Sequence, residues 1–404
     1  MYSRITSNIF WAFLPQKTDY TFLSIRFNLD KTQSQKDFLA IAHLLEHYLV
    51  NDVRVKDGPD LYEVQGDVSA DCLTIHFRFY KKDAIKSLKD IFNIFQYQSF
   101  DNEDLFVQEK KRVISELAAK NDDLFEKLYQ ISSAERFIGF NPYKEDYNSA
   151  IEAIKSIKID DIKKLFSKIN KNKITVFSAY KPNIVFRLKT AGLLKSNLSG
   201  LNYEVFDASQ KMTLSDKSER KIEFPGLSNA YALIVLPGIS TKEDFKTEVL
   251  FQELISWTFY RRKDNISDKL QKYGIYDLRL KNFSYGRGGF IMIYFGVLRE
   301  DQNKAVDLIL DRVKTAIGDL ENNEKDLNAL RRNIEAGIKK ELGDNNTYRE
   351  ILLDYLFYRG GFDKKHEISS SDMLKNIKKI KEELFRNDKA NIFFCGNLSK
   401  LSKI

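Results

Sequence analysis

EDLFVQEKKRVISELAAKNDD, at residues 103–123, resembles EKDLNALRRNIEAGIKKELGDNN, at residues 324–346. A second pair of similar segments, KITVFSAY at 173–180 and ANIFFCGN at 390–397, is rich in β-forming residues. Similar elements therefore recur in the same order, at a period of roughly 200 residues that is too long for a solenoid. This pattern predicts an internal duplication. The alternative is two α+β domains that look alike by chance.

The predicted fold class is α+β, with two similar domains that each consist of an antiparallel-rich sheet packed with helices. We expect a first domain at residues 1–190, a linker at 191–218 with weak periodicity, and a second domain at 219–404. The apolar spacing predicts strands at 9–15, 20–27, 72–80, 173–180, 221–226, 231–238, 283–297 (a pair or a bent strand) and 390–398. It predicts helices at 37–50, 83–97, 103–120, 123–137, 247–260, 300–317 and 324–342, with two shorter helices around Ile157.

The composition excludes several classes of protein. With 43% hydrophobic and 30% charged residues in 404, the chain can bury full-size cores and is not disordered. Its net charge of +8 is spread along the sequence without aromatic–basic clustering, so we do not expect nucleic-acid binding. No apolar run approaches the roughly 18 residues of a membrane span. Two cysteines exclude a disulfide scaffold, and no secretory signal pattern opens the chain, so we expect a cytoplasmic protein.

The main chemical motif is His43-Leu44-Leu45-Glu46-His47, which contains two of the four histidines of the chain. On a helix, positions i, i+3 and i+4 share one face, so both imidazoles and the Glu46 carboxyl group project together. Two histidines one turn apart can bind one Zn²⁺, and an adjacent carboxylate can accept a proton from a water molecule. This is the inverted H-x-x-E-H zinc-peptidase signature. The alternative is a chance coincidence of two structural histidines.

A catalytic zinc site usually has a third protein ligand. The helix predicted at 103–120 offers two glutamates, Glu109 and Glu116, which lie seven residues apart and therefore two turns along one face. Helical register alone does not choose between them, and either one can be a solvated surface residue.

The chain resembles the pitrilysin family, which includes insulin-degrading enzyme and the mitochondrial processing peptidase. In that family an H-x-x-E-H helix is followed by a helix with the pattern E-x₆-E, as in EKKRVISE here. The resemblance covers the whole chain and is strongest over residues 36–123. It implies one Zn²⁺ per chain, bound by His43, His47 and Glu116. It also implies that Glu46 is the general base and that Glu109 lies outside the ligand shell and supports it.

Two further site assignments rest on this resemblance alone. The segment GDVSADCLT (66–74) loosely matches a substrate-holding N-A-x-T strand, which points to Ser69 and Ala70. In the second half, Lys269 and Tyr276 have the spacing of an arginine and a tyrosine that bind substrate in the family. Lysine cannot reproduce the bidentate fork of arginine, so this pair departs from the family pattern.

The resemblance implies a zinc-dependent metalloendopeptidase that hydrolyses peptides or precursor peptides bound in extended form. Family chambers need four such domains, and this chain offers two. We therefore expect a chamber of two subunits, either a homodimer or a heterodimer with a related subunit that lacks zinc ligands. The alternative function is an inactive or scaffold subunit of a heterodimeric processing peptidase.

Overall fold

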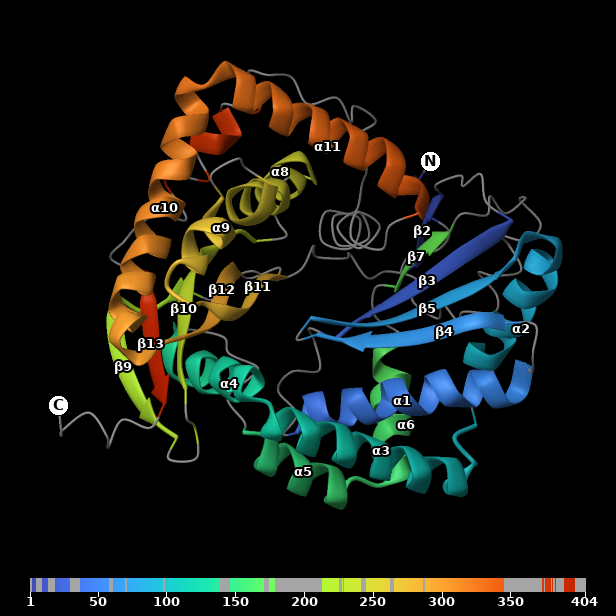
Figure 1. Cartoon of the computed structure of the whole chain (residues 1–404). Coiled ribbons are helices and arrows are strands. Elements are labelled where there is room, and N and C mark those ends of the chain that lie inside the picture. Colours follow the sequence, from blue (N-terminus) through green and yellow to red (C-terminus); the bar gives the residue numbers. More distant parts are fainter. Residues whose placement is uncertain are drawn as a thin grey trace. The chain divides into compact units, whose positions relative to one another are not determined.

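The computed structural model of the chain describes residues 2–4, 9–13, 19–29, 37–57, 61–69, 71–96, 99–138, 146–170, 174–178, 213–224, 227, 229–240, 245–261, 265–285, 288–344, 373, 375–378, 380, 382 and 389–396. It divides into two compact units (Figure 1). The first unit consists of Met1–Asp123, Glu145–Asp207 and Leu342–Phe362, and the second of Leu124–Lys144, Ala208–Glu341 and Asp363–Ile404.

The first unit contains a mixed six-stranded sheet with the order β1-β2-β7-β3-β5-β4. Strands β2 and β7 pair in parallel, and every other neighbouring pair is antiparallel. The strands are β1 (Tyr2–Arg4), β2 (Ile9–Phe13), β3 (Tyr20–Asn28), β4 (Leu61–Val68), β5 (Cys72–Tyr80) and β7 (Ile174–Ser178). Strand β4 lies at one edge of this sheet and contacts helix α1.

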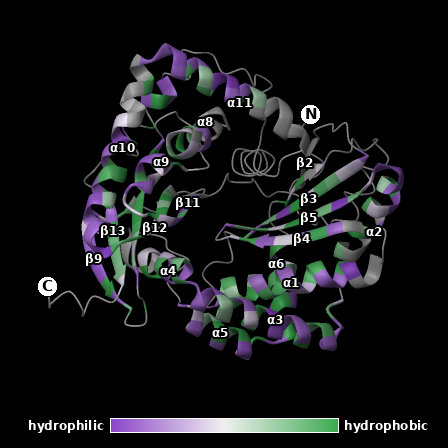
Figure 2. Ribbon diagram, in the orientation of Figure 1, coloured by the Kyte–Doolittle hydropathy of each residue, from purple (hydrophilic) through white to green (hydrophobic). Residues whose placement is uncertain are grey.

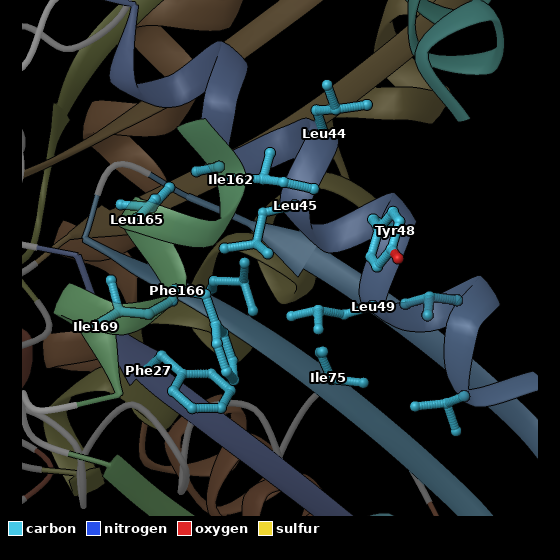
Figure 3. Close-up of a cluster of buried hydrophobic side chains, with 14 of the residues drawn as sticks. Phe27, Leu44, Leu45, Tyr48, Leu49, Ile75, Ile162, Leu165, Phe166 and Ile169 are labelled. Atoms are coloured by element: carbon cyan, nitrogen blue, oxygen red, sulfur yellow. The ribbon is translucent and has the colours of Figure 1, made fainter. Parts of the chain in front are cut away.

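One face of this sheet is apolar and packs against helix α1 (Phe38–Asp57) and helix α6 (Ile159–Ile169). The apolar side chains of α6 recur at three- and four-residue steps, so one face of the helix is buried. Figure 3 shows Phe27 of β3 and Ile75 of β5 meeting side chains of both helices, including Leu45 and Phe166. This cluster sets the position of α1 over the sheet.

The remaining helices of the first unit lie around α1. They are α2 (Ala84–Gln96), preceded by a 3-10 turn at Lys81–Asp83, α3 (Glu103–Asp122) and α5 (Tyr147–Ser156). Helix α3 packs on α1 and on α5, and Figure 1 shows α1 between the sheet and α3. In Figure 2 helices α3 and α5 have both hydrophilic and hydrophobic residues, as expected for amphipathic helices at the solvent side of a domain.

The second unit contains a mixed five-stranded sheet with the order β11-β12-β10-β13-β9, in which only β13 and β9 pair in parallel. Its strands are β9 (Ser218–Glu223), β10 (Ala230–Gly238), β11 (Tyr276–Tyr285), β12 (Gly288–Val297) and β13 (Asn391–Gly396). Its helices are α4 (Leu124–Arg136), α8 (Phe245–Ser256), a π-helical turn at Trp257–Arg261, α9 (Ile266–Gln271), a 3-10 turn at Arg299–Asp301, α10 (Gln302–Asn322) and α11 (Glu324–Asp344). A two-stranded sheet pairs β6 (Phe137–Ile138) with β8 (Thr213–Leu214).

Helix α4 covers one face of the five-stranded sheet, although it ends at Arg136 and the first strand of that sheet begins only at Ser218. Phe125 and Leu128 of α4 are buried among Leu233, Met292 and Phe393 of the central strands. The strands β10 and β12 are buried along most of their length, so they are continuous apolar runs rather than alternating ones. The second unit therefore depends on a helix that belongs, by its place in the sequence, to the predicted first domain.

The two sheets have the same strand arrangement. The order β2-β7-β3-β5-β4 in the first unit corresponds to β9-β13-β10-β12-β11 in the second. Corresponding neighbours also pair in the same way in both sheets: the first two strands of each order are parallel, and all later neighbours are antiparallel.

The predicted α+β class, with two helix-packed sheets, is confirmed. Most element bounds agree within a few residues, but the helix predicted at 37–50 extends to Asp57. The strand predicted at 221–226 begins at Ser218, within the predicted linker, and residues 191–212 lie outside the described part of the chain. In the parts that the structure describes, no helix combines the length and the apolar character that a membrane crossing requires.

Truncation of a buried side chain on α4 should destabilise the second unit. We expect Leu128→Ala to lower the free energy of unfolding by about 2–5 kcal/mol, because the side chain is fully buried. In hydrogen exchange, the amides of β10 and β12 should lose protection in Leu128→Ala and keep it in the control Lys127→Ala. Loss of protection confined to β3 and β5 would contradict this assignment of α4.

Candidate metal centre

Helix α1 is buried on almost every side, and its two histidines occupy the positions that remain open. Between Ala40 and Val50, His43 and His47 are the only residues that are not buried. Their spacing of four residues places both imidazoles on one face, with ring centroids 5.0 Å apart. Because the apolar residues around them anchor the helix in the core, the histidines present their ring nitrogens on a rigid support.

Helix α3 brings two carboxylates to this face of α1. Its N-terminus is capped by Asn102, whose side-chain oxygen accepts a hydrogen bond from the Leu105 N–H at 3.0 Å. Its buried face contains Leu105, Val113 and Leu117, together with Glu109. Glu116 lies beside that face and is half-buried. The packing of α3 on α1 therefore places both predicted glutamates next to the histidines.

His43, His47 and Glu116 form a group of donors that can hold a metal ion, with the ligand atoms all within 4.8 Å of one another. Oε2 of Glu116 lies 3.2 Å from Nε2 of His47 and 3.4 Å from Nε2 of His43. Two ligands at about 2.1 Å from a tetrahedral Zn²⁺ are about 3.4 Å apart, so these separations fit one ion. Imidazole nitrogens and a carboxylate oxygen are also the ligand types that zinc prefers.

Glu46 lies beside this group. Its Oε2 atom is 3.8 Å from Nε2 of His47, and the residue is 8% exposed. Burial raises the pKa of Glu46 from 4.5 to about 7, against the opposing effect of the nearby His47. A carboxyl group with this pKa can both accept and release a proton near neutral pH.

His47 and Glu116 shift each other's pKa values. Hydrogen bonds with His43 and then His47 hold the pKa of Glu116 well below its ordinary value. Burial by itself lowers the pKa of His47, but the hydrogen bond with Glu116 and the charge of Glu46 outweigh it and raise the pKa. Glu116 is therefore a carboxylate over the whole physiological range, as a metal ligand must be.

Glu109 is fully buried and supports His47 from the other side. Its Oε2 atom lies 3.4 Å from Nδ1 of His47, and its Oε1 atom accepts a hydrogen bond of 2.7 Å from the Arg112 guanidinium. A hydrogen bond at Nδ1 fixes the ring orientation and leaves Nε2 to face a metal. The supporting role that the resemblance implies for Glu109 stays a prediction.

Sequence reasoning missed two cations that balance the glutamates. Arg112 follows Glu109 by three residues, and Lys120 follows Glu116 by four and donates to its Oε1 atom at 2.6 Å. The signal was available, because i,i+3 and i,i+4 pairs of opposite charge face each other on a helix. Each carboxylate thus has one oxygen on a cation and the other facing the histidines.

The structure gives Ser69 a local role in the turn between β4 and β5. Its hydroxyl oxygen accepts hydrogen bonds from the N–H groups of Asp71 and Cys72 at 3.3 and 3.2 Å. These bonds are typical of a serine that forms a turn. Ala70 lies outside the described residues, so the substrate-binding role of this pair stays a prediction.

Lys269 and Tyr276 belong to the second unit, on α9 and at the start of β11. The Tyr276 ring lies against the backbone of Gly296, edge-to-face with Tyr231 at 5.8 Å between centroids. Burial, then a hydrogen bond with Tyr231, raises the pKa of Tyr276 above its ordinary value, so its hydroxyl stays protonated. The relation of these two residues to the metal-binding group stays a prediction.

At the level of sequence, neither a protein-family model nor a curated protein matches the chain. Solved structures do resemble it over nearly its full length. A protease from Helicobacter pylori has a TM-score of 0.73 at 14% identity and covers 98% of both chains. A peptidase M16 inactive domain from Pseudomonas fluorescens has a TM-score of 0.69 at 15% identity and covers 98% of this chain and 97% of that one.

A third similar structure is a chain of complex III2 from Candida albicans, with a TM-score of 0.69 at 12% identity, covering 99% of this chain and 97% of that chain. Together these likenesses show that the chain has the fold of the M16 peptidase-like proteins. At such low identity they establish the fold alone. One of the similar proteins is described as inactive, so a functional conclusion has to rest on the site itself.

Substitution of Glu116 should weaken zinc binding, whereas substitution of an exposed glutamate away from His43 and His47 should not. We expect Glu116→Gln to weaken zinc binding by more than about 100-fold, since loss of a supporting partner alone typically costs 10–100-fold. Glu109→Gln should fall in that smaller range. The control is Glu152→Gln on α5, an exposed glutamate that forms an ion pair with Lys155 and should bind zinc like the wild type. Competition with a chelating dye measures the affinities, and equal affinities for Glu116→Gln and the control would exclude this site.

The raised pKa of Glu46 predicts a pH-dependent stability of the metal-free protein. The group titrates near 4.5 when unfolded and near 7 when folded, so between these values the folded state holds the extra proton. Raising the pH therefore destabilises the fold. From pH 4 to 8, wild type should lose about 2–3 kcal/mol of unfolding free energy relative to Glu46→Gln, which stays neutral. Urea titrations across this range test it, and parallel curves for the two proteins would contradict it.

Proposed function

We propose that the chain is a zinc-dependent endopeptidase. The observation that carries this proposal is the convergence of His43, His47 and Glu116 on one point, with the Glu46 carboxyl group beside them. A buried general base adjacent to three zinc ligands has no evident packing function, because a polar cluster of this kind costs stability unless it is used. The M16 peptidase-like fold agrees with the proposal without establishing it.

In this proposal His43, His47 and Glu116 hold one Zn²⁺ per chain. Zinc in such a site supplies Lewis acidity, which polarises the scissile carbonyl and makes a water molecule more acidic. Glu46 accepts the proton of the attacking water and passes it to the leaving amine, and its carboxyl group beside His47 is placed for both steps. Glu109 keeps the His47 ring in place throughout.

We propose that the peptide substrate binds in extended form along the edge strand β4. The Ser69 N–H donates to the Cys72 carbonyl at 2.9 Å, so this pair is hydrogen-bonded across the hairpin. Alternation along the antiparallel register then directs the backbone groups of Val68, Gly66 and Val64 away from β5. In agreement, the Val64 carbonyl accepts a hydrogen bond of 2.6 Å from Arg54 of α1. A peptide can thus pair with β4 from Gly66 onwards, next to Glu46.

We further propose that the two units arose by duplication and that two chains form a closed peptidase chamber. The identical strand arrangement of the two sheets supports the first point. The second rests on the resemblance, which implies a homodimer or a heterodimer with a related zinc-less subunit. In such an assembly Lys269 and Tyr276, or a partner's equivalent pair, would bind substrate. A cytoplasmic location stays a prediction, and the buried free Cys72 and Cys395 are compatible with it.

The competing function is an inactive or scaffold subunit of a heterodimeric peptidase. The inactive M16 domain among the similar structures makes this a real alternative. Against it, this chain retains the complete donor group and the base, with the supporting Glu109 in contact with His47.

The experiment pairs zinc content with cleavage of a quenched peptide library. Wild type should contain about one zinc per chain and cleave peptides. Glu46→Gln should keep its zinc and lose roughly 10²–10⁴-fold in kcat, because only the proton acceptor is removed. Glu152→Gln is again the control and should match wild type. Zinc-loaded wild type that cleaves nothing, alone or with a co-purified related subunit, would favour the scaffold function.

A further inference from the structure

Gly66, in the middle of the edge strand β4, lies directly against the side chain of Glu46. A Cβ atom added to Gly66 would overlap with Oε1, Cδ and Cγ of Glu46. All three overlapping atoms belong to the Glu46 side chain, so the carboxyl group would have to leave its place. A side chain at position 66 and the carboxyl group of Glu46 therefore cannot occupy this space together.

The backbone of Gly66 gives no separate reason for a glycine. The residue pairs with Ile75 in regular antiparallel register, and it is not among the residues with positive φ. Any residue can adopt such a strand conformation, and glycine weakens a strand because it loses more conformational freedom on folding. A glycine inside a strand usually marks the close approach of another group, and here that group is Glu46.

The strand cannot withdraw easily from the helix to relieve a clash. Two residues before Gly66, the Val64 carbonyl accepts the hydrogen bond from Arg54 at 2.6 Å, and Val64 itself is buried in the core. Arg54 in turn donates to Asn51 at 3.2 Å, and Asn51 donates to the His47 carbonyl at 3.1 Å. This chain of hydrogen bonds ties β4 to the turn of α1 that contains His47.

We infer that Gly66 is a positioning residue for Glu46: the missing side chain leaves room for the carboxyl group between α1 and the edge strand, beside the metal-binding group. The catalytic consequence rests on the proposed function, whereas the steric relation does not. Two alternative roles for this glycine predict different results. The glycine can be required by the strand itself, or by a substrate backbone that passes close to it.

The first test is a double-mutant cycle on the metal-free protein, with melting temperature as the readout. The four proteins are wild type, Gly66→Ala, Glu46→Ala and the double variant. Gly66→Ala should lower the melting temperature by about 2–8 °C in wild type, as expected for overpacking. It should leave the melting temperature unchanged or slightly raised in Glu46→Ala, because alanine suits a strand better than glycine.

The matched control is Gln65→Ala, the neighbouring position on β4, whose side chain leaves the opposite face of the sheet. It should show no coupling to Glu46→Ala. An equal loss from Gly66→Ala in both backgrounds would overturn the inference, because the strand and not Glu46 would then need the glycine.

The second test uses the zinc-loaded protein and the quenched peptides. Gly66→Ala should keep its zinc and its KM but lose kcat by about 10²–10⁴-fold, as loss of a general base does. Added to Glu46→Gln, it should cause no further loss. A multiplied loss, or a raised KM with kcat unchanged, would overturn the inference in favour of substrate contact. If wild type cleaves no peptide, the proposed function fails, and the melting cycle still decides the role of Gly66.

Discussion

The site depends on one constraint, the burial of α1 between the sheet and α3. Apolar side chains anchor this helix almost all around its circumference, and two open positions remain in its central turns, at His43 and His47. Protein interiors are packed as densely as organic crystals, so α1 cannot turn about its axis and expose other residues in place of the histidines. The ring nitrogens are therefore held in place before any ligand binds, which is the usual condition for a precise metal site.

The other parts of the site come from helix α3 and strand β4, which lie next to this part of α1. Helix α3 supplies Glu116 and Glu109, and each carboxylate divides its oxygens between a cation on its own helix and the histidines. On the edge strand β4, Gly66 has no side chain, and the Glu46 carboxyl group occupies the space that a side chain would fill. Burial in that space shifts the Glu46 pKa to about 7, and a solvated glutamate would not have this property.

The sequence predicts the part of the site that depends on local periodicity. The i,i+4 spacing places His43 and His47 on one face, and two turns of helix relate Glu109 to Glu116. Both glutamates face the histidines, and which of them can share one metal ion with both rings depends on how α3 packs on α1. Helical register alone does not decide this, and the prediction of Glu116 rests on the family resemblance. The contact between Gly66 and Glu46 and the docking of α4 on the second sheet are tertiary, and no local pattern in the sequence signals them. The roles of Ser69, Ala70, Lys269 and Tyr276 remain predictions.

The central claim is that His43, His47 and Glu116 bind one zinc ion. X-ray absorption at the zinc edge, on the purified protein loaded with one equivalent of zinc, tests it most directly. We expect two imidazole ligands with the remaining ligands oxygen, at about 2.0–2.2 Å, and the loss of one imidazole in His43→Ala. A sulfur ligand at about 2.3 Å, or a spectrum unchanged in His43→Ala, would contradict it.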